Sequence, residues 1–124
     1  MRIDKLYIEE YKNLKNFNID FCEQELTSVL IGKNGAGKSN VIEALVIIFR
    51  DLDLGKMPQF SYDINYFCKD HRVKVSADAK TKKYSIDVDE KNISFVHFLS
   101  EDNSGNKAYL PKHVFAYYSG PSNR

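Results

Sequence analysis

The chain has 124 residues, of which 43% are hydrophobic and 13% aromatic, and a formal net charge of +1. This length suits one domain with a modest core, and the near-zero charge argues neither for nor against a nucleic-acid partner. No apolar run approaches the roughly 20 residues of a membrane span. The charged start MRIDKLYIEE lacks the apolar centre of a signal peptide. We therefore expect a soluble, cytoplasmic protein without a membrane partner.

Two β-type runs open the chain. The first is IDKLYIEEY (3–11), and a polar connector, KNLKN (12–16), separates it from FNIDF (17–21). The second run alternates, which places Phe17, Ile19 and Phe21 on one face of a strand. The two runs predict a hairpin that enters the fold before the next motif.

A glycine-rich stretch, GKNGAGKSN, occupies residues 32–40 and follows the short apolar run Val29-Leu30-Ile31. An apolar run without alternation is typical of a strand covered on both faces. After the stretch, VIEALVIIF (41–49) is apolar almost all round, which favours a buried helix. A strand, a glycine loop and a helix in this order are the context that a P-loop requires.

The spacing Gly32-x-x-x-x-Gly37-Lys38-Ser39 is the full P-loop pattern. Gly32, Gly35 and Gly37 predict positions with φ above zero, because glycine has no Cβ and tolerates such angles. Backbone N–H groups then point at an anion, and the helix start adds partial positive charge. Lys38 would reach the β- and γ-phosphates, and the Ser39 hydroxyl would ligate Mg²⁺. The expected cofactors are ATP and Mg²⁺.

The second half of the chain reads as β structure. Gly55 and Pro58 predict irregular backbone over 51–60. Four β-type runs follow at 62–67, 72–77, 83–88 and 93–99, separated by turn-prone stretches, and they predict an antiparallel meander. Residues 114–118 read as one more strand.

The motifs resemble the opening of ABC-type ATPases of the RecF, structural-maintenance-of-chromosomes and OLD-nuclease kind. Members tend to begin I-x-x-F-(R/K)-x-(L/F)-x-x-F and to continue with GxNGxGKSN. The first pattern is matched by Ile8, Tyr11 (in place of Phe), Lys12, Leu14 and Phe17, and the second by Gly32, Asn34, Gly35, Gly37, Lys38, Ser39 and Asn40. The ending, VFAYYSGPSNR, is similar to a segment of RecF-like ATPases of DNA repair and anti-phage defence.

This resemblance implies an α/β fold, the N-terminal part of an ABC-type P-loop NTPase with an antiparallel β subdomain and an incomplete core sheet. Within 1–124 the expected parts are the hairpin and P-loop strand (1–31), P-loop and helix (32–50), β meander (51–110) and a last strand with the chain end (111–124). The nucleotide would contact Gly32, Lys33, Asn34, Gly35, Ala36, Gly37, Lys38, Ser39, Asn40 and Lys12, with Ser39 on the metal. Lys12 is equally well interpreted as an exposed turn lysine.

Hydrolysis needs groups that the chain lacks. Phosphoryl transfer requires a residue that orients water and an acid that holds Mg²⁺. In the family these come from an apolar strand ending in Asp-Glu and from a serine-glycine signature on a second ATPase head. SIDVDE (85–90) alternates and reads as a strand running into a turn, and YSGPS (118–122) precedes no acidic strand. We therefore expect no catalytic residues here, and partners in the remaining half of the head, a second head or an effector protein.

Other classes of protein fit less well. A GTPase would show NKxD and DxxG, and neither occurs; a nucleoside kinase would need an arginine-rich lid, and the arginines are scattered. A scaffold that binds nucleotide without catalysis remains the alternative. A basic edge formed by Arg72, Lys74, Lys80, Lys82 and Lys83 would contact a DNA backbone or serve as a solvated face that blocks edge-to-edge pairing.

Overall fold

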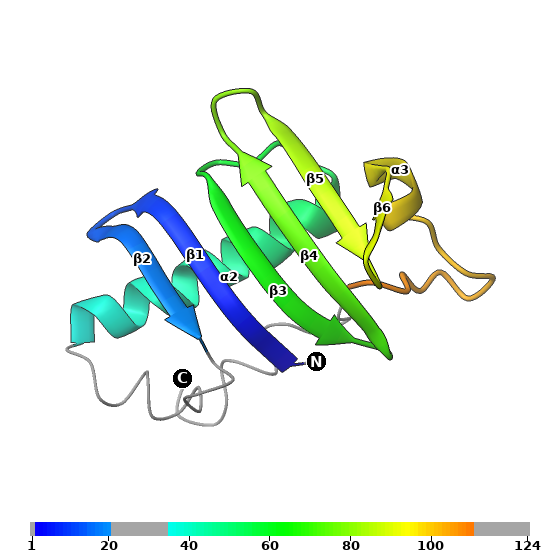
Figure 1. Cartoon of the computed structure of the whole chain (residues 1–124), viewed down its shortest axis with the longest axis horizontal. Coiled ribbons are helices and arrows are strands. Elements are labelled where there is room, and N and C mark those ends of the chain that lie inside the picture. The colour runs from blue at the N-terminus through cyan, green and yellow to red at the C-terminus, as the bar shows by residue number, and fades with distance from the viewer. Residues whose placement is uncertain (1, 21–34, 111–124) are drawn as a thin grey trace.

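A computed structural model of the chain describes residues 2–20 and 35–110, and for residues 35–39 it describes the backbone alone. The described part holds six strands and two helices (Figure 1). In chain order they are β1 (Arg2–Tyr11), β2 (Leu14–Asp20), α2 (Gly35–Leu54), β3 (Tyr62–Cys68), β4 (His71–Asp78), β5 (Lys83–Val88), β6 (Lys91–Ile93) and α3 (Phe95–Phe98).

The six strands form one sheet in the order β2-β1-β3-β4-β5-β6, and every neighbouring pair is antiparallel. The chain makes the β1–β2 hairpin first and returns after α2 to place β3 beside the free edge of β1. There Leu6 pairs with Ile64 and Ile8 pairs with Tyr62. The predicted hairpin is confirmed, but its predicted connector at 12–16 was wrong, because β2 begins at Leu14 and only two residues join the strands. The predicted meander is confirmed over β3, β4 and β5.

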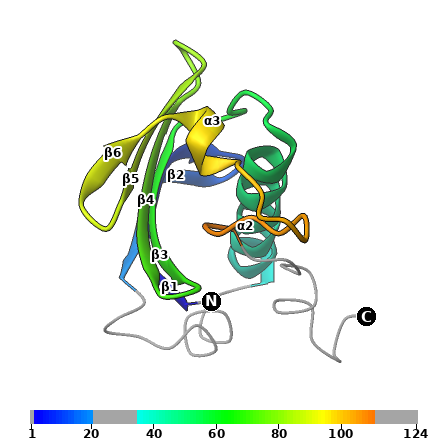
Figure 2. The ribbon, with the colours of Figure 1, turned by 90° about the vertical axis from the view of Figure 1, so that its right-hand side faces the viewer.

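One helix covers one face of this sheet (Figure 2). The strands alternate, so that Tyr62, Ile64 and Tyr66 of β3 are buried while Asp63 faces outward. Residues of α2 at helical spacing bury one stripe against these strands: Val41, Ala44, Leu45, Ile48, Phe49 and Leu52. Each fully buried aliphatic side chain contributes about 1.5–3 kcal/mol, so this contact fixes the position of α2 on the sheet.

The predicted helix at 41–49 is present, but α2 is longer at both ends. At its C-terminal end the expectation of irregular backbone from residue 51 was wrong, since the helix continues to Leu54. Gly55, at φ +71°, ends it: its N–H donates to the carbonyl of Leu52 (3.2 Å), and the Lys56 N–H donates to the carbonyl of Asp51 (2.9 Å). These two bonds are a Schellman motif, whose C′ residue requires a left-handed backbone.

The expectation of a strand over 93–99 was also wrong. β6 ends at Ile93, and the Ser94 side chain caps α3 by accepting from the backbone N–H of His97 (3.1 Å). A serine oxygen in this position satisfies a helix N–H that would otherwise lack a partner. The helical turn brings Phe98 into the core and places the ring of Phe95 4.8 Å from that of Tyr84. An apolar run of this length fits a strand or a short helix, and the cap decides for the helix.

Other expectations lie outside the described residues. These are the P-loop strand at 29–31 and the strand at 114–118, and with them the incomplete core sheet. No helix of the described residues is both long enough and apolar enough to cross a membrane.

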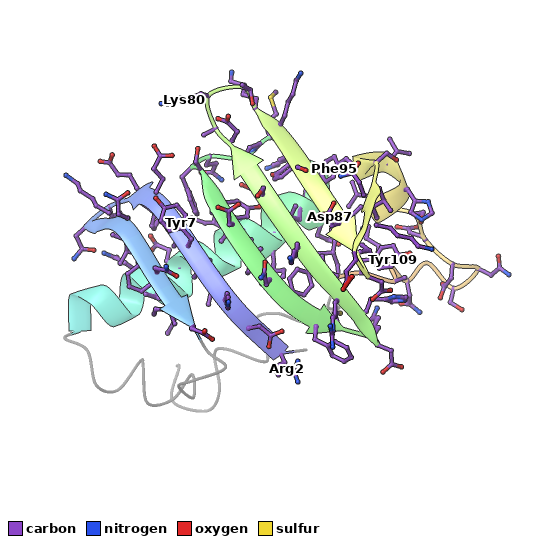
Figure 3. All side chains as sticks on the ribbon, viewed as in Figure 1. Arg2, Tyr7, Lys80, Asp87, Phe95 and Tyr109 are labelled. Carbon is purple, nitrogen blue, oxygen red and sulfur yellow. The ribbon has the colours of Figure 1, made fainter. Side chains whose placement is uncertain are left out.

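The outer face of the sheet, opposite α2, carries polar side chains of both signs (Figure 3). Lys74 of the predicted basic edge pairs across the strands with Asp87, and the Arg72 backbone N–H donates to Asp89. Lys80 lies at the tip of the β4–β5 turn. Because basic and acidic groups alternate here, this arrangement fits a solvated face better than a continuous phosphate-binding surface.

Candidate nucleotide-binding site

The N-terminal end of α2 is where the glycine-rich motif meets the described structure. The helix begins at Gly35, inside the predicted loop, and runs for 20 residues. The expectation of positive φ at Gly35 and Gly37 was wrong, because both residues are helical here. Glycine can adopt both positive and negative φ, and each residue that joins an existing helix adds a hydrogen bond. Gly32, Lys33 and Asn34 lie outside the described residues.

The β1–β2 turn lies against the first turns of this helix. Its two residues, Lys12 and Asn13, separate β1 from β2, and Lys12 has φ +54°. The side-chain amide of Asn40 donates to the Asn13 side chain. The hairpin predicted from residues 3–21 is thereby attached to the helix that follows the motif.

Glu43 is the point at which the turn and the helix are joined electrostatically. Its carboxylate lies 2.5 Å from the Lys12 ammonium and accepts a hydrogen bond from the Tyr11 hydroxyl. The hydrogen bonds from Lys12 and then Tyr11 hold the pKa of Glu43 below its usual value. Glu43 is the one acidic residue among the first ten of α2. Its charge is therefore compensated at the end of the helix where an anion would bind.

Tyr11 connects this contact to the core. Its ring lies 4.8 Å from that of Phe60, and the Lys12 ammonium lies 5.6 Å from the centre of the Tyr11 ring, within cation–π range. Partial burial, together with the hydrogen bond to Glu43, raises the pKa of Tyr11 to about 12. The hydroxyl therefore stays protonated and continues to donate at neutral pH.

The predicted site residues fall into three groups. Gly32, Lys33 and Asn34 are not described, and residues 35–39 are described only as helical backbone. Lys12 and Asn40, from separate elements, are brought to the same end of α2. The sequence analysis missed Asn13 and Glu43. Helical spacing could have indicated Glu43, which lies one turn after Ser39.

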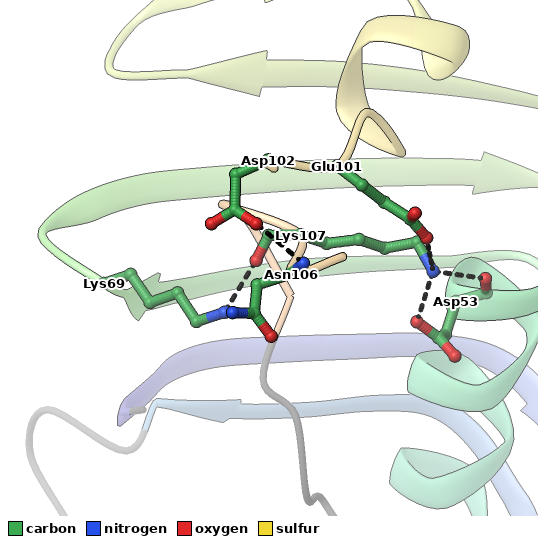
Figure 4. A network of polar contacts seen from close by, with 6 residues as sticks. All are labelled: Asp53, Lys69, Glu101, Asp102, Asn106 and Lys107. Atoms are coloured by element: carbon green, nitrogen blue, oxygen red, sulfur yellow. Dashed lines mark hydrogen bonds and ion pairs between the residues drawn. The ribbon is translucent and has the colours of Figure 1, made fainter. Parts of the chain in front are cut away.

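A second polar cluster is formed by Asp53, Lys69, Glu101, Asp102, Asn106 and Lys107 (Figure 4). It lies at the opposite end of the sheet, where Phe67 pairs with Arg2. The Lys69 ammonium donates to the carbonyl of Lys107 (2.6 Å), and the Lys107 ammonium contacts Asp53 (2.9 Å) and Glu101 (3.8 Å). A cavity of about 390 Å³ opens beside this cluster. Both ammonium groups are already paired within the protein, so the cluster connects the loop after α3 to β3 and α2.

This architecture, an antiparallel sheet covered by a helix that begins within a G-x-x-x-x-GKS motif, fits a P-loop NTPase. The family model described as the AAA ATPase domain matches residues 1–117. The chain belongs to this AAA ATPase domain family, whose members have the P-loop NTPase fold. No solved structure matches.

Several curated proteins are similar over part of the chain. A DNA replication and repair protein RecF of Caldanaerobacter subterraneus is 31% identical over 88 residues, 67% of this chain and 23% of that protein. The RecF protein of an Exiguobacterium species is 35% identical over 48 residues, 39% of this chain and 12% of that protein. A retron Ec83 probable ATPase of Escherichia coli is 31% identical over 45 residues, 36% of this chain and 8% of that protein. The chain spans less than a quarter of the length of each of these relatives.

Proposed function

We propose that this chain is the ATP-binding portion of a RecF-like ABC-type ATPase that acts in DNA repair or phage defence. The observation that carries the proposal is the family match over 1–117, which includes the motif Gly32-x-x-x-x-Gly37-Lys38-Ser39 directly before the buried part of α2. Two of the similar proteins named above are DNA replication and repair proteins RecF, which supports a role in DNA repair, and one is a retron probable ATPase, which supports an ATPase.

The N-terminal end of α2 fits the phosphates of a nucleoside triphosphate. The first N–H groups of a 20-residue helix have no intrahelical acceptor, and the helix dipole adds positive charge there. Before nucleotide binds, Glu43 is ion-paired with Lys12, a basic residue held at this end of the helix. In the proposed complex the backbone of residues 32–37 surrounds the phosphates, Lys38 binds the β- and γ-phosphates, and Ser39 binds Mg²⁺. The bound Mg²⁺ would neutralise charge on the phosphates.

Hydrolysis is proposed to need more protein than this chain. The chain holds neither the apolar Asp-Glu strand nor the signature that the family uses, and it spans less than a quarter of the similar proteins. We propose that a C-terminal half of the ATPase head and a second head complete the site. The outer stripe of α2 (Ile42, Val46 and Leu54) supports this, because Ile42 and Val46 are only half-buried and Leu54 is exposed. Apolar side chains gathered on one surface favour a protein contact.

A nucleotide titration tests the proposal. Wild-type protein should bind ATP at millimolar concentration or below in the presence of Mg²⁺, measured by calorimetry or by a fluorescent ATP analogue. Lys38→Ala should abolish binding, while the control Lys91→Ala, an exposed lysine of β6, should leave it unchanged. Absence of binding by the wild type would overturn the proposal. The same protein should not turn ATP over unaided.

A nucleotide-dependent scaffold remains the second candidate function. Supplying the remaining portion of the ATPase distinguishes this scaffold from the proposed ATPase. An ATPase then hydrolyses ATP and loses activity with Lys38→Ala. A scaffold binds ATP but hydrolyses none under the same conditions.

A further inference from the structure

The contact between Lys12 and Glu43 carries an inference about how the nucleotide site is regulated, and the inference rests on the proposed ATP-binding function. The Lys12 ammonium and the Glu43 carboxylate lie 2.5 Å apart, and both side chains remain about half exposed, at 53% and 47%. An ion pair this exposed contributes little to stability, because water screens it and two long side chains must be held in place. It is therefore a contact that a stronger anion can replace.

The position of the pair places such an anion within reach. Glu43 lies four residues after Ser39, which corresponds to about 6 Å along the helix axis. The ammonium of Lys12 is carried on a flexible four-carbon stem that projects from a turn lying against the same end of α2. A triphosphate at this helix end carries more negative charge than a single carboxylate. It would also receive hydrogen bonds from the first N–H groups of the helix.

We propose that Glu43 competes with the phosphates of the nucleotide for Lys12, and that ATP binding transfers the Lys12 ammonium from Glu43 to the nucleotide. Glu43 is thus a positioning residue that sets the resting place of Lys12.

Tyr11 prepares Glu43 for this exchange. When Lys12 leaves, the carboxylate keeps the hydrogen bond from the Tyr11 hydroxyl, and the Tyr11 ring is held against Phe60. Glu43 therefore keeps a hydrogen-bond partner. A carboxylate left without one would make the exchange costly. Asn40, bonded to Asn13, keeps the turn beside the helix while the lysine moves.

The test is a comparison of Mg²⁺–ATP dissociation constants. Glu43→Gln removes the competing charge and keeps an oxygen that accepts from Tyr11, so ATP should bind about two- to fivefold more tightly. In Lys12→Met binding should weaken, and Glu43→Gln should then give no gain in the double variant. The matched control is Asp53→Asn, which removes a charge from the last turn of the same helix, where the partner is Lys107. It should leave the dissociation constant unchanged.

Each outcome decides for or against the exchange. If Glu43→Gln binds ATP as the wild type does or more weakly, or if the gain persists without Lys12, Glu43 does not compete for that lysine. If Asp53→Asn gives the same gain, the effect is one of bulk charge. Circular dichroism and a urea titration of each variant separate these results from loss of folding. If the wild type itself binds no ATP, the proposed function fails first; if only the Glu43 comparison fails, ATP binding stands.

Discussion

The ammonium of Lys107 lies 2.9 Å from Oδ1 of Asp53, so that the loop after α3 is ion-paired to the last turn of α2, 54 residues earlier in the chain. The same ammonium donates to the backbone carbonyl of Asp53 (3.3 Å), and the carbonyl of Lys107 accepts from Lys69. Lys107 is thus bonded to α2 and to the β3–β4 turn (Figure 4). Its side chain is only 20% exposed.

Replacing this lysine tests what the cluster contributes. Lys107→Met keeps the apolar stem and removes the charge, so the free energy of unfolding should fall by about 1 kcal/mol. Urea denaturation followed by circular dichroism measures it. Lys91→Met, at an exposed position of β6, is the matched control and should change stability by less than about 0.5 kcal/mol. Equal effects of the two changes would show that the Lys107 contacts contribute nothing specific.

The glycine that ends α2 should be sensitive to substitution. Gly55 has φ +71°, and a Cβ there would lie 3.4 Å from Cδ1 of Leu99. Gly55→Ala should therefore lower the free energy of unfolding by about 1 kcal/mol, mostly through the left-handed backbone. Gly55→Asn should lower the free energy of unfolding by less, because asparagine tolerates this conformation. A larger loss for asparagine than for alanine in the same urea titration would point to crowding rather than to backbone strain.

Two hairpin turns lack the glycine that their backbone favours. Lys69 and Asp70 join β3 to β4, and Asp89 and Glu90 join β5 to β6, with φ between +50° and +70° at all four residues. Consecutive positive φ values are typical of type I′ turns, which prefer glycine at the second position. Glu90→Gly should raise the free energy of unfolding by about 1 kcal/mol.

The control for this change is Glu90→Ala, which removes the same side chain and retains a Cβ. It should give no gain, because alanine has the same conflict with a left-handed backbone. If alanine stabilises as much as glycine, the benefit comes from losing the glutamate charge. Thermal unfolding of the three proteins distinguishes the two explanations.

The elements that the sequence predicted well were those with a strong local signal. The β-type residues of 62–67, between turn-prone stretches, predicted β3, and the almost wholly apolar run from Val41 to Phe49 predicted the centre of α2. In both cases the composition of a single segment was enough to indicate the element.

The sequence predicted element ends and cross-chain contacts poorly. Gly55 is a typical residue for a helix end, yet the sequence analysis ended the helix at Phe49. Whether the helix continues to this glycine depends on two backbone hydrogen bonds that close around a left-handed residue. The sequence did not predict the partner of Lys12 either, because Glu43 lies 31 positions further along the chain. Only the packing of α2 on the sheet brings the two residues together.

Acid should destabilise the fold through carboxylates that accept hydrogen bonds. Contacts from His71 and the backbone N–H of Arg72 hold the pKa of Asp89 below its usual 3.8, and backbone N–H groups of Asn106 and Ser104 do the same for Asp102. A folded-state pKa below the unfolded value stabilises the protein above about pH 4, and this contribution is lost as pH falls through the folded value.

Unfolding midpoints in urea between about pH 6 and pH 3 measure this dependence. The wild-type midpoint should stay level down to about pH 4 and then decrease. The unfolding midpoint of Asp89→Asn should be lower than that of the wild type at pH 6. It should decrease less steeply toward pH 3, since asparagine does not titrate. If the two proteins lost stability in parallel, the titration of Asp89 would not be linked to folding.

The outer stripe of α2 provides the last prediction, because Ile42 and Val46 are half-buried while Val41 and Leu45, one position before each, are buried in the core. If another part of the ATPase covers this stripe, the isolated chain should bind an apolar dye and self-associate in sedimentation experiments. Val46→Ser should reduce both effects and lower the free energy of unfolding by less than about 1 kcal/mol. Leu45→Ser, on the buried side, should cost several kcal/mol instead. A monomeric wild-type chain without dye binding would show that the described surface needs no partner.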